Sequence, residues 1–424
     1  MKNICFLVSE GKTKLFFEIY KYLNNKHSIN IFWVSPNNRW EKWLIKKGIK
    51  KENILNLSNK YVENKNLKNY SEVFNAENKY NCNFSKIISF DRILRNKNFK
   101  ISYTYLSIIF EEIEKFLLNK KIMHVFSEQT WAFEISTTYI CKYLSIKSIY
   151  LCNTKFPPDN ENGRFTFFEG YKLDKLPNIE NKSINLDQNF YKRIVENYRY
   201  NFQPTTYYFS YKKKFFSFSK FINIYLHFKY LFTDKYDLTK KNFYELIVYN
   251  LKLLINNFIN YFFIFDTFEN KENNFLFCFH RYPDSAIDII GYKNSNQDHV
   301  LLNIIKETPS NININLRFHP HANNYENFFK IKKKYKCYPN VKILNPKIHI
   351  NELIKDSNYV FSIAGTVSLE AALLGKKSYI MEDLFFSKIL NKYSNNNPIN
   401  FDFDRNQKNS LKNDYKIYEF LKDL

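Results

Sequence analysis

Along the first 150 residues, short apolar runs alternate with segments of helical period. Apolar runs of strand length occur at 4–8, 29–34, 54–57, 87–90, 124–127 and 148–151. Between them, apolar residues recur every three or four positions at 13–23, 40–47, 103–118 and 131–144, as in amphipathic helices. Strands that alternate with helices predict a parallel sheet with helices packed on both of its faces.

The same alternation returns after residue 274. The pattern predicts strands at 275–279, 312–318, 341–344, 359–363 and 378–381, and helices at 297–306, 324–334, 350–355 and 368–374. Residues 358–381 are the most informative, because a strand, a turn at Ala364-Gly365-Thr366, a short helix and a second strand follow one another there. The chain is therefore predicted to be an α/β protein with two Rossmann-like domains.

Residues 181–268 have a different character. Tyr, Phe and Lys interleave there, no glycine occurs and strand alternation is absent, which predicts two or three long helices, one of them at 244–265. The predicted domains are an N-terminal Rossmann-like domain at 1–180, a helical insert at 181–268, a C-terminal Rossmann-like domain at 269–400 and a tail at 401–424.

Composition changes this picture only slightly. The chain has 424 residues, of which 45% are apolar and 19% aromatic, and this argues against disorder. A formal charge of +23 would ordinarily indicate nucleic acid or an anionic membrane, but Lys, Asn and Ile are abundant everywhere, so much of the charge is compositional. The insert can pack on its own protein, rest on an anionic membrane surface, or stack on single-stranded nucleic acid.

The cysteines and the apolar segments indicate a cytoplasmic protein. The six cysteines are scattered without CxxC or Cys/His spacing, which favours reduced thiols and no metal site. The first strand is too short for the core of a signal peptide, and polar residues interrupt the apolar segment 246–265, so it fails as a membrane span.

Three carboxylates follow predicted strands of the N-terminal domain: Glu10, Asp91 beside Arg92, and Glu128. Ligands of a doubly wound sheet lie beyond the carboxyl ends of its strands, so each can act as a general base. Each can equally cap a helix or pair with Lys12 or Arg92. Glu128 is the preferred base, because it directly precedes a helix near the middle of the predicted sheet.

The segment 153–170 contains two prolines, a glycine and Arg164, and it is predicted to form a loop over the cleft. Arg164 can contact an anionic sugar or can be a solvent-facing charge.

Polar residues also follow three predicted strands of the C-terminal domain. His280, Arg281 and Ser285 follow one strand, His319 and Pro320 the next, and the turn at Gly365 and Thr366 opens a helix that carries Glu370 one turn later. A helix N-terminus and a histidine both suit a phosphate, and a carboxylate accepts hydrogen bonds from ribose hydroxyls. Together these residues predict a nucleotide site.

The ordered set resembles a known family. It consists of His280-x-x-Pro283-Asp284-Ser285, Gln297, Arg317-Phe318-His319-Pro320, Gly365-Thr366-x-x-x-Glu370 and Gly375-Lys376. This order resembles the bacterial capsule polysaccharide biosynthesis family, which includes transferases that add Kdo to lipid-linked acceptors. The His-Pro pair and the Gly-Thr turn are also similar to two short motifs of bacterial sialyltransferases. The resemblance covers residues 274–382, and the N-terminal half matches in outline only.

The resemblance implies a GT-B architecture, in which two Rossmann-like domains face each other across a cleft. By analogy, His319 and the Gly365-Thr366 turn would hold the phosphate of a CMP-sugar, with Glu370 on the ribose. His280 and Pro320 are further residues expected to bind the nucleotide. No metal or other cofactor is expected. Asp284 and Arg317-Phe318 stand where the family more often has Glu and a Lys-Glu pair, which leaves the donor sugar open.

The expected activity is an inverting transfer of Kdo or sialic acid to a saccharide or lipid-linked acceptor at the cytoplasmic face of the membrane. Glu128 would be the base, and His319 would stabilise the departing CMP. Glu10, Asp91, Arg164, Arg281 and Ser285 are further candidates for contacts with donor or acceptor. Two alternatives remain: a noncatalytic scaffold of capsule export with a degenerate transferase fold, and a basic protein that binds nucleic acid. The ordered motifs favour the enzyme and no nucleic-acid partner.

Overall fold

The chain folds into two compact units. The computed structural model describes residues 2–26, 29–65, 70–153, 165–170, 236–268, 273–320 and 326–394, together with a few single positions. The first unit is built mainly on Met1–Cys152 and the second mainly on Val248–Leu424. Each unit has a sheet and a hydrophobic core of its own.

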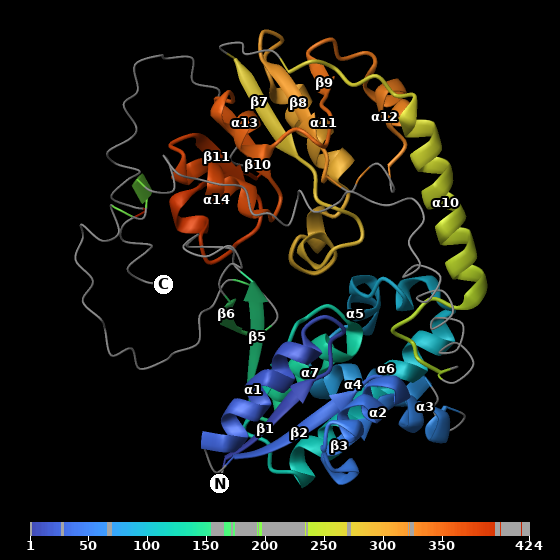
Figure 1. Ribbon diagram of the computed structural model, residues 1–424. Helices are drawn as coiled ribbons and strands as arrows, with labels where there is room; N and C mark the ends of the chain where they lie inside the picture. The colour runs from blue at the N-terminus through green and yellow to red at the C-terminus, as the bar shows by residue number, and fades with distance from the viewer. Residues whose placement is uncertain are drawn as a thin grey trace. The chain divides into compact units, whose positions relative to one another are not determined.

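The first unit is organised around a six-stranded sheet (Figure 1). The strand order is β3-β2-β1-β4-β5-β6, and the neighbouring strands from β3 to β5 all pair in parallel. The strands are β1 Lys2–Leu7, β2 Ile29–Ser35, β3 Ile54–Asn56, β4 His124–Ser127, β5 Lys147–Asn153 and β6 Phe165–Glu169. In this doubly wound order the direction of winding reverses between β1 and β4.

Seven α-helices of the first unit connect or cover these strands. They are α1 Thr13–Lys26, α2 Asn38–Lys46, α3 Leu57–Asn64, α4 Tyr70–Tyr80, α5 Phe84–Phe90, α6 Phe99–Asn119 and α7 Ala132–Tyr143. Four of them begin after an asparagine whose side chain accepts a backbone N–H of the first turn: Asn37, Asn56, Asn83 and Asn98. The abundant asparagines therefore act as helix caps.

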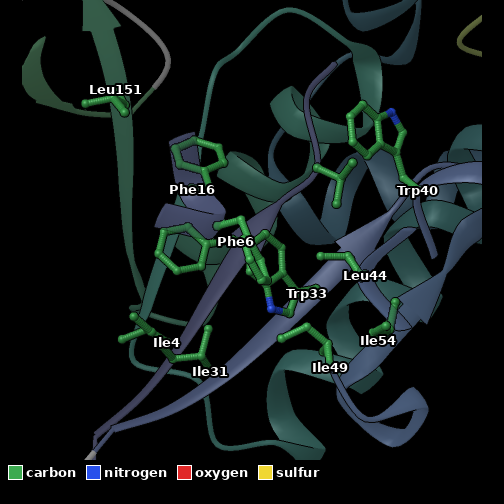
Figure 2. Packing of buried hydrophobic residues seen from close by; sticks show 12 residues of the cluster. Ile4, Phe6, Phe16, Ile31, Trp33, Trp40, Leu44, Ile49, Ile54 and Leu151 are labelled. Carbon is green, nitrogen blue, oxygen red and sulfur yellow. The ribbon is translucent and has the colours of Figure 1, made fainter. Parts of the chain in front are cut away.

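The core on one face of this sheet is strongly aromatic (Figure 2). Phe6 of β1 has its ring centroid 5.2 Å from that of Phe16 and 5.1 Å from that of Trp33. Trp33 is fully buried. Closely packed rings contribute about 0.5–1.5 kcal/mol per pair beyond the area that they bury. These contacts pack helix α1 against strands β1 and β2 of the sheet.

The second unit repeats the strand order of the first. Its sheet runs β9-β8-β7-β10-β11-β12, and every neighbouring pair is parallel. The strands are β7 Asn274–Cys278, β8 Asn313–Arg317, β9 Val341–Ile343, β10 Tyr359–Ser362, β11 Lys377–Ile380 and β12 Asn391–Lys392. The reversal of winding falls between β7 and β10.

Besides α10 (Phe243–Tyr261), most of which belongs to this unit, the α-helices in the described part of the second unit are α11 Gln297–Glu307, α12 Phe328–Tyr335, α13 Ile350–Lys355 and α14 Thr366–Leu373. Buried side chains of α13 and α14 pack on Leu276 and Cys278 of β7. One face of the second sheet is therefore covered by these two helices. The prediction of an α/β fold with two Rossmann-like sheets is confirmed, whereas the cleft between them stays a prediction, as do the four domain boundaries.

One predicted strand is wrong. Residues 87–90 belong to helix α5, in which Phe84, Ile87 and Phe90 are buried. Their spacing of three positions is helical, but a four-residue apolar run does not distinguish a strand from a buried helix. Asp91 therefore follows a helix and not a strand.

Two connections contain more structure than the sequence predicted. The polar segment between β3 and α5 holds the helices α3 and α4. The segment 153–170, predicted to be a loop, ends in strand β6 at the edge of the first sheet beside β5. Phe168 of this strand is fully buried, so the aromatic run contributes to the core of the first unit.

Of the predicted insert, the structure describes the helix α10 (Phe243–Tyr261) and its flanks. Asn260 near its end donates to the carbonyl of Glu326 and accepts the N–H of Phe328, both in the second unit. Among the described helices, none is both long and apolar enough to traverse a bilayer.

Candidate functional site

The reversal point of the second sheet brings together two segments that lie far apart in the sequence. His280 follows β7, and the Ala364-Gly365 turn follows β10. The backbone N–H of Ala364 donates to Nε2 of His280 over 3.1 Å. Because ligands of doubly wound sheets bind at this point, the structure places two of the predicted nucleotide-binding segments at the expected edge.

His280 is held as a neutral ring. Its Nε2 accepts the N–H of Ala364 and therefore carries no proton. Burial lowers the pKa of His280 to about 4, although the Asp284 carboxylate favours the protonated ring. Its backbone is fixed by Gln297, whose side chain accepts the His280 N–H at 2.7 Å. His280 therefore shapes the turn after β10 and does not supply a positive charge at neutral pH.

The turn after β10 is supported by serine hydroxyls. Ser362 Oγ accepts the N–H of Gly365 at 3.1 Å and lies 2.7 Å from Ser368 Oγ. A Cβ added at Gly365 would lie 3.0 Å from Ser362 Oγ and 3.2 Å from His280 Cε1. Only glycine fits this position without displacing its neighbours.

The turn leaves the N-terminus of α14 open. Within the described part of the chain, the N–H groups of Thr366 and Val367 have no hydrogen-bond acceptor. Such groups, together with the helix dipole, form a site for an anion such as a phosphate. Thr366 Oγ1 donates to Glu370 Oε1 over 3.4 Å, so the carboxylate predicted to contact a ribose faces the same turn.

His319 and Pro320 follow β8, the strand on the other side of β7. The His319 carbonyl accepts the N–H of Ala322 at 2.7 Å. The preceding Phe318 stacks on Phe279 with ring centroids 4.3 Å apart and an angle of 5° between the planes. This stack fixes the start of the loop at the carboxyl edge of the sheet. The role of His319 in binding phosphate stays a prediction.

Arg281 and Ser285 lie in the segment between β7 and the one-turn π-helix η4 (Ala286–Ile290). Both are partly exposed, and the Ser285 side chain makes no capping bond to η4. Their predicted contacts with substrate are not tested by this geometry.

The reversal point of the first sheet carries Glu128, directly after β4. Ser9, which follows β1, donates a short hydrogen bond from its Oγ to Glu128 Oε2. Lys12 Nζ lies 3.4 Å from Glu128 Oε1, so the ion pair considered from the sequence is formed. The Glu128 side chain remains 27% exposed, which leaves it accessible to a substrate hydroxyl.

The residue after Glu128 holds an unusual backbone conformation. Gln129 has a φ of 62°, in the left-handed region that non-glycine residues rarely adopt. Its buried side-chain amide donates to Ser127 Oγ at 2.6 Å and to Thr138 Oγ1 at 2.8 Å. Strained residues of this kind are concentrated at functional sites, and this one fixes where the Glu128 backbone points.

The N-terminus of α7, which follows Glu128, is closed by two carboxylates. Glu134 accepts the N–H groups of Thr130 and Trp131 at 2.6 and 2.9 Å, and Asp91 accepts that of Ala132 at 2.9 Å. Burial, and then the Glu128 carboxylate, raise the pKa of Glu134 to about 8. Sequence reasoning missed Glu134, because the capping position before it is a tryptophan and not a Ser, Thr or Asp.

Asp91 is a structural carboxylate. Besides Ala132, its Oδ1 accepts the N–H groups of Ile93 and Leu94 at 2.8 and 3.0 Å. Burial raises the pKa of Asp91, although these three N–H groups oppose the shift. The alternative of a helix cap is therefore the one that the structure supports. Glu10 lies exposed in the turn before α1, and Arg164 lies outside the described residues.

No cluster of three or more His, Cys, Asp and Glu side chains suited to a metal ion occurs in the described ranges. All six cysteines are free thiols, and Cys5, Cys141 and Cys278 are buried.

Each of the two six-stranded sheets has the same Rossmann-type strand order and polar residues at its reversal point, which defines an α/β protein with two doubly wound units. Residues 240–388, about a third of the chain, match the family described as "Capsule polysaccharide biosynthesis protein". The matched region contains His280, His319 and the Gly365-Thr366 turn, and over these residues it agrees with the resemblance seen in the sequence.

Several solved structures show a distant likeness. The KpsC β-Kdo 2,7 transferase of Thermosulfurimonas dismutans is 12% identical, with a TM-score of 0.33 and coverage of 73% of this chain and 80% of that one. The β-Kdo 2,4 transferase of the same organism is 10% identical, with a TM-score of 0.33 and coverage of 64% and 74%. The UDP-GlcNAc 2-epimerase of Methanocaldococcus jannaschii is 12% identical, with a TM-score of 0.26 and coverage of 99% and 92%.

At these scores the fold assignment rests on the strand order of the chain itself. A comparison with curated protein sequences finds no match.

Proposed function

We propose that this protein is an inverting glycosyltransferase of capsule or other surface polysaccharide synthesis. It transfers Kdo or sialic acid from a CMP-sugar to a saccharide or lipid-linked acceptor. The open N-terminus of α14, set beside the neutral ring of His280 at the reversal point of the second sheet, carries the proposal. The family match over the same residues supports it.

In the proposed reaction, Glu128 takes the proton of the acceptor hydroxyl while that oxygen attacks the anomeric carbon of the donor. The bond to the phosphate oxygen breaks on the opposite side, so the configuration inverts and CMP departs. The N–H groups of Thr366 and Val367, with His319, stabilise the charge that develops on the phosphate. Preorganised dipoles and histidine supply this stabilisation without a metal ion.

The first experiment is thermal unfolding of the full chain with CMP, UDP, GDP or ADP, each without added metal. A ligand at about a hundred times its dissociation constant stabilises a protein by about 2.7 kcal/mol, which raises the melting temperature measurably. Stabilisation by CMP alone is expected. Stabilisation by UDP or GDP would support a glycosyltransferase that uses a UDP-linked or GDP-linked donor. No stabilisation by any nucleotide would favour the noncatalytic scaffold.

We further propose that the enzyme works at the inner face of the cell membrane, and that α10 contacts an anionic leaflet. Tyr244, Val248, Leu251, Leu254 and Phe258 recur at helical spacing on α10 and are 75%, 45%, 52%, 59% and 70% exposed. An exposed apolar row on a strongly basic chain suits the interface of an acidic bilayer.

Flotation with vesicles of phosphatidylglycerol, and with vesicles of phosphatidylcholine alone, tests the membrane proposal. The wild type should float with the acidic vesicles, and Leu254→Glu combined with Phe258→Glu should abolish flotation. Equal flotation of the wild type and the double variant would contradict a role for α10.

A further inference from the structure

Arg317, the last residue of β8, is only 7% exposed, and its buried Nε has no hydrogen-bond partner among the described residues. No ion pair of Arg317 occurs within the described ranges either. Burying an N–H group without a partner is unfavourable, so this arginine calls for an explanation other than stability.

The strand register places Arg317 on the helix-covered face of the sheet. Arg317 is the direct neighbour of Cys278 in the parallel pair of β8 and β7. Cys278 packs with residues of α13 and α14. Phe318 and Phe279, one position further along each strand, stack on each other. Because successive side chains of a strand point to opposite faces, Arg317 lies on the face of α13 and α14.

The electrostatic surroundings locate the guanidinium more closely. Burial raises the pKa of Cys278 to about 12. The positive charge of Arg317 opposes this shift, and the Glu370 carboxylate adds to it. Arg317 also lowers the pKa of His349, for which burial is again the largest cause. His349 Nδ1 accepts the N–H of Asn351 at 3.2 Å at the start of α13. Arg317 thus lies near Cys278 and near His349, the residue before α13, at the carboxyl edge.

This position is one strand away from the reversal point. The order β8-β7-β10 puts Arg317 two strands from the Gly365-Thr366 turn, and neighbouring strands lie about 4.8 Å apart. The edge therefore offers two sites for negative charge: the open N-terminus of α14 and the guanidinium of Arg317. A nucleotide-linked acidic sugar carries two such groups, a phosphate and a carboxylate, on one anomeric carbon.

We propose that Arg317 binds an oxyanion of the donor, either the sugar carboxylate or the phosphate. This inference rests on the proposed function and deepens it. The planar guanidinium presents paired N–H donors that fit both oxygens of a carboxylate or of a phosphate, which a lysine cannot do. The Nε group has no partner in the free protein, and in the proposed complex the donor supplies that partner.

The test uses full-length wild type, Arg317→Met and Arg317→Lys, with thermal unfolding of the ligand-free proteins measured first. Methionine fills a similar volume without a charge, so ligand-free Arg317→Met should unfold at the same temperature as the wild type or higher. A clear fall in the unfolding temperature would show that Arg317 has a structural partner and would overturn the inference.

Binding is then measured with CMP and with CMP-linked sialic acid. If Arg317 holds the carboxylate, Arg317→Met should weaken binding of the CMP-sugar by about tenfold or more and leave CMP binding unchanged. If it holds the phosphate, both should weaken by that factor. Arg317→Lys should bind only slightly better than Arg317→Met, because lysine lacks the paired N–H donors of the guanidinium. Unchanged binding of both ligands would overturn the inference.

The same variants separate this inference from the proposed function. If the wild type binds no nucleotide, the proposed function fails, and inorganic phosphate and free sialic acid become the probes. Stabilisation of the wild type by either anion, absent in Arg317→Met, would still support an oxyanion site. Identical responses of the two proteins would overturn it.

Discussion

The helices α7 and α14 hold equivalent places in the two units but differ at their N-termini. Each follows the fourth strand of a sheet with the same order. In α7, the first N–H groups donate to the carboxylates of Glu134 and Asp91. In α14, the N–H groups of Thr366 and Val367 have no acceptor among the described residues. The first N–H groups of α7 are therefore satisfied within the protein, and those of α14 are available to a ligand.

The difference shows how one topology is used for two kinds of chemistry. The reversal point of the first sheet gathers carboxylates and hydroxyls around Glu128, which suits proton abstraction from an acceptor. That of the second sheet gathers a neutral histidine, backbone N–H groups and, close by, Arg317, which suits a negatively charged donor. The two sheets share one topology, so the different roles come from the side chains at the strand ends and not from the fold.

The largest expected effect concerns the first unit. Glu128→Gln removes the proposed base but keeps the shape, so the rate of sugar transfer should fall by about 10²–10⁴-fold. CMP binding, measured by calorimetry, should stay unchanged. Glu18→Gln, which changes an exposed carboxylate of α1 outside the proposed site, is the matched control and should transfer normally. Turnover of Glu128→Gln near that of the control would remove Glu128 from the mechanism.

The corresponding change in the second unit is His319→Ala. Loss of one donor to the developing charge of the phosphate should lower transfer by about 10²–10³-fold in assays with saturating donor. Unfolding temperatures of variant and wild type should agree, which separates a loss of chemistry from a loss of fold. Full activity in a folded variant would exclude the proposed role.

The open helix N-terminus is tested by Thr366→Pro against Thr366→Ala. Proline is tolerated at the first position of a helix, and the backbone of Gly365 before it is extended, at φ −99° and ψ 143°. Both variants lose the hydroxyl, and only the proline loses the N–H. CMP affinity should therefore be about tenfold lower for Thr366→Pro than for Thr366→Ala. Equal affinities would show that this N–H does not contact the nucleotide.

The glycines at the two sheet edges should respond differently to alanine. At Gly365 a Cβ meets Ser362 Oγ at 3.0 Å, and Gly365→Ala should destabilise the second unit by about 1–3 kcal/mol. At Gly11 nothing lies within 4 Å, so Gly11→Ala should be neutral or slightly stabilising. Urea unfolding of both variants measures the difference, and similar values would contradict the tight packing at Gly365.

The smallest effect is a pH dependence of stability. The unfolded chain protonates His280 near pH 6.5, whereas the folded protein does so only near pH 4. Stability should therefore fall as the pH decreases from about 6.5 to 4, because the unfolded state binds the extra proton. Urea unfolding at several pH values should give a flatter profile for His280→Gln than for the wild type. Parallel profiles would mean that the ring titrates normally in the folded protein.

Much of the fold follows from local patterns. The strand His124–Ser127 and the helix Ile350–Lys355 have the predicted bounds, and most other elements differ by a few residues at their ends. The errors occurred where a pattern was short or masked by polar residues. An apolar run at 87–90 belongs to a helix, and asparagine-rich segments hide α3 and α4 because asparagine caps helices here.

The sequence by itself determined the order of most strands and helices, the polar residues at the strand ends and the resemblance to a family in the C-terminal half, because these depend on periodicity and on short motifs. Only the tertiary structure decided which of these residues are already paired. Ala132 meets Asp91 across 41 positions, and Ala364 meets His280 across 84. The Nε of Arg317 meets no partner in the described residues. Whether a charge or an N–H group remains available to a ligand depends on such distant contacts, and these form only when the strands assemble into sheets.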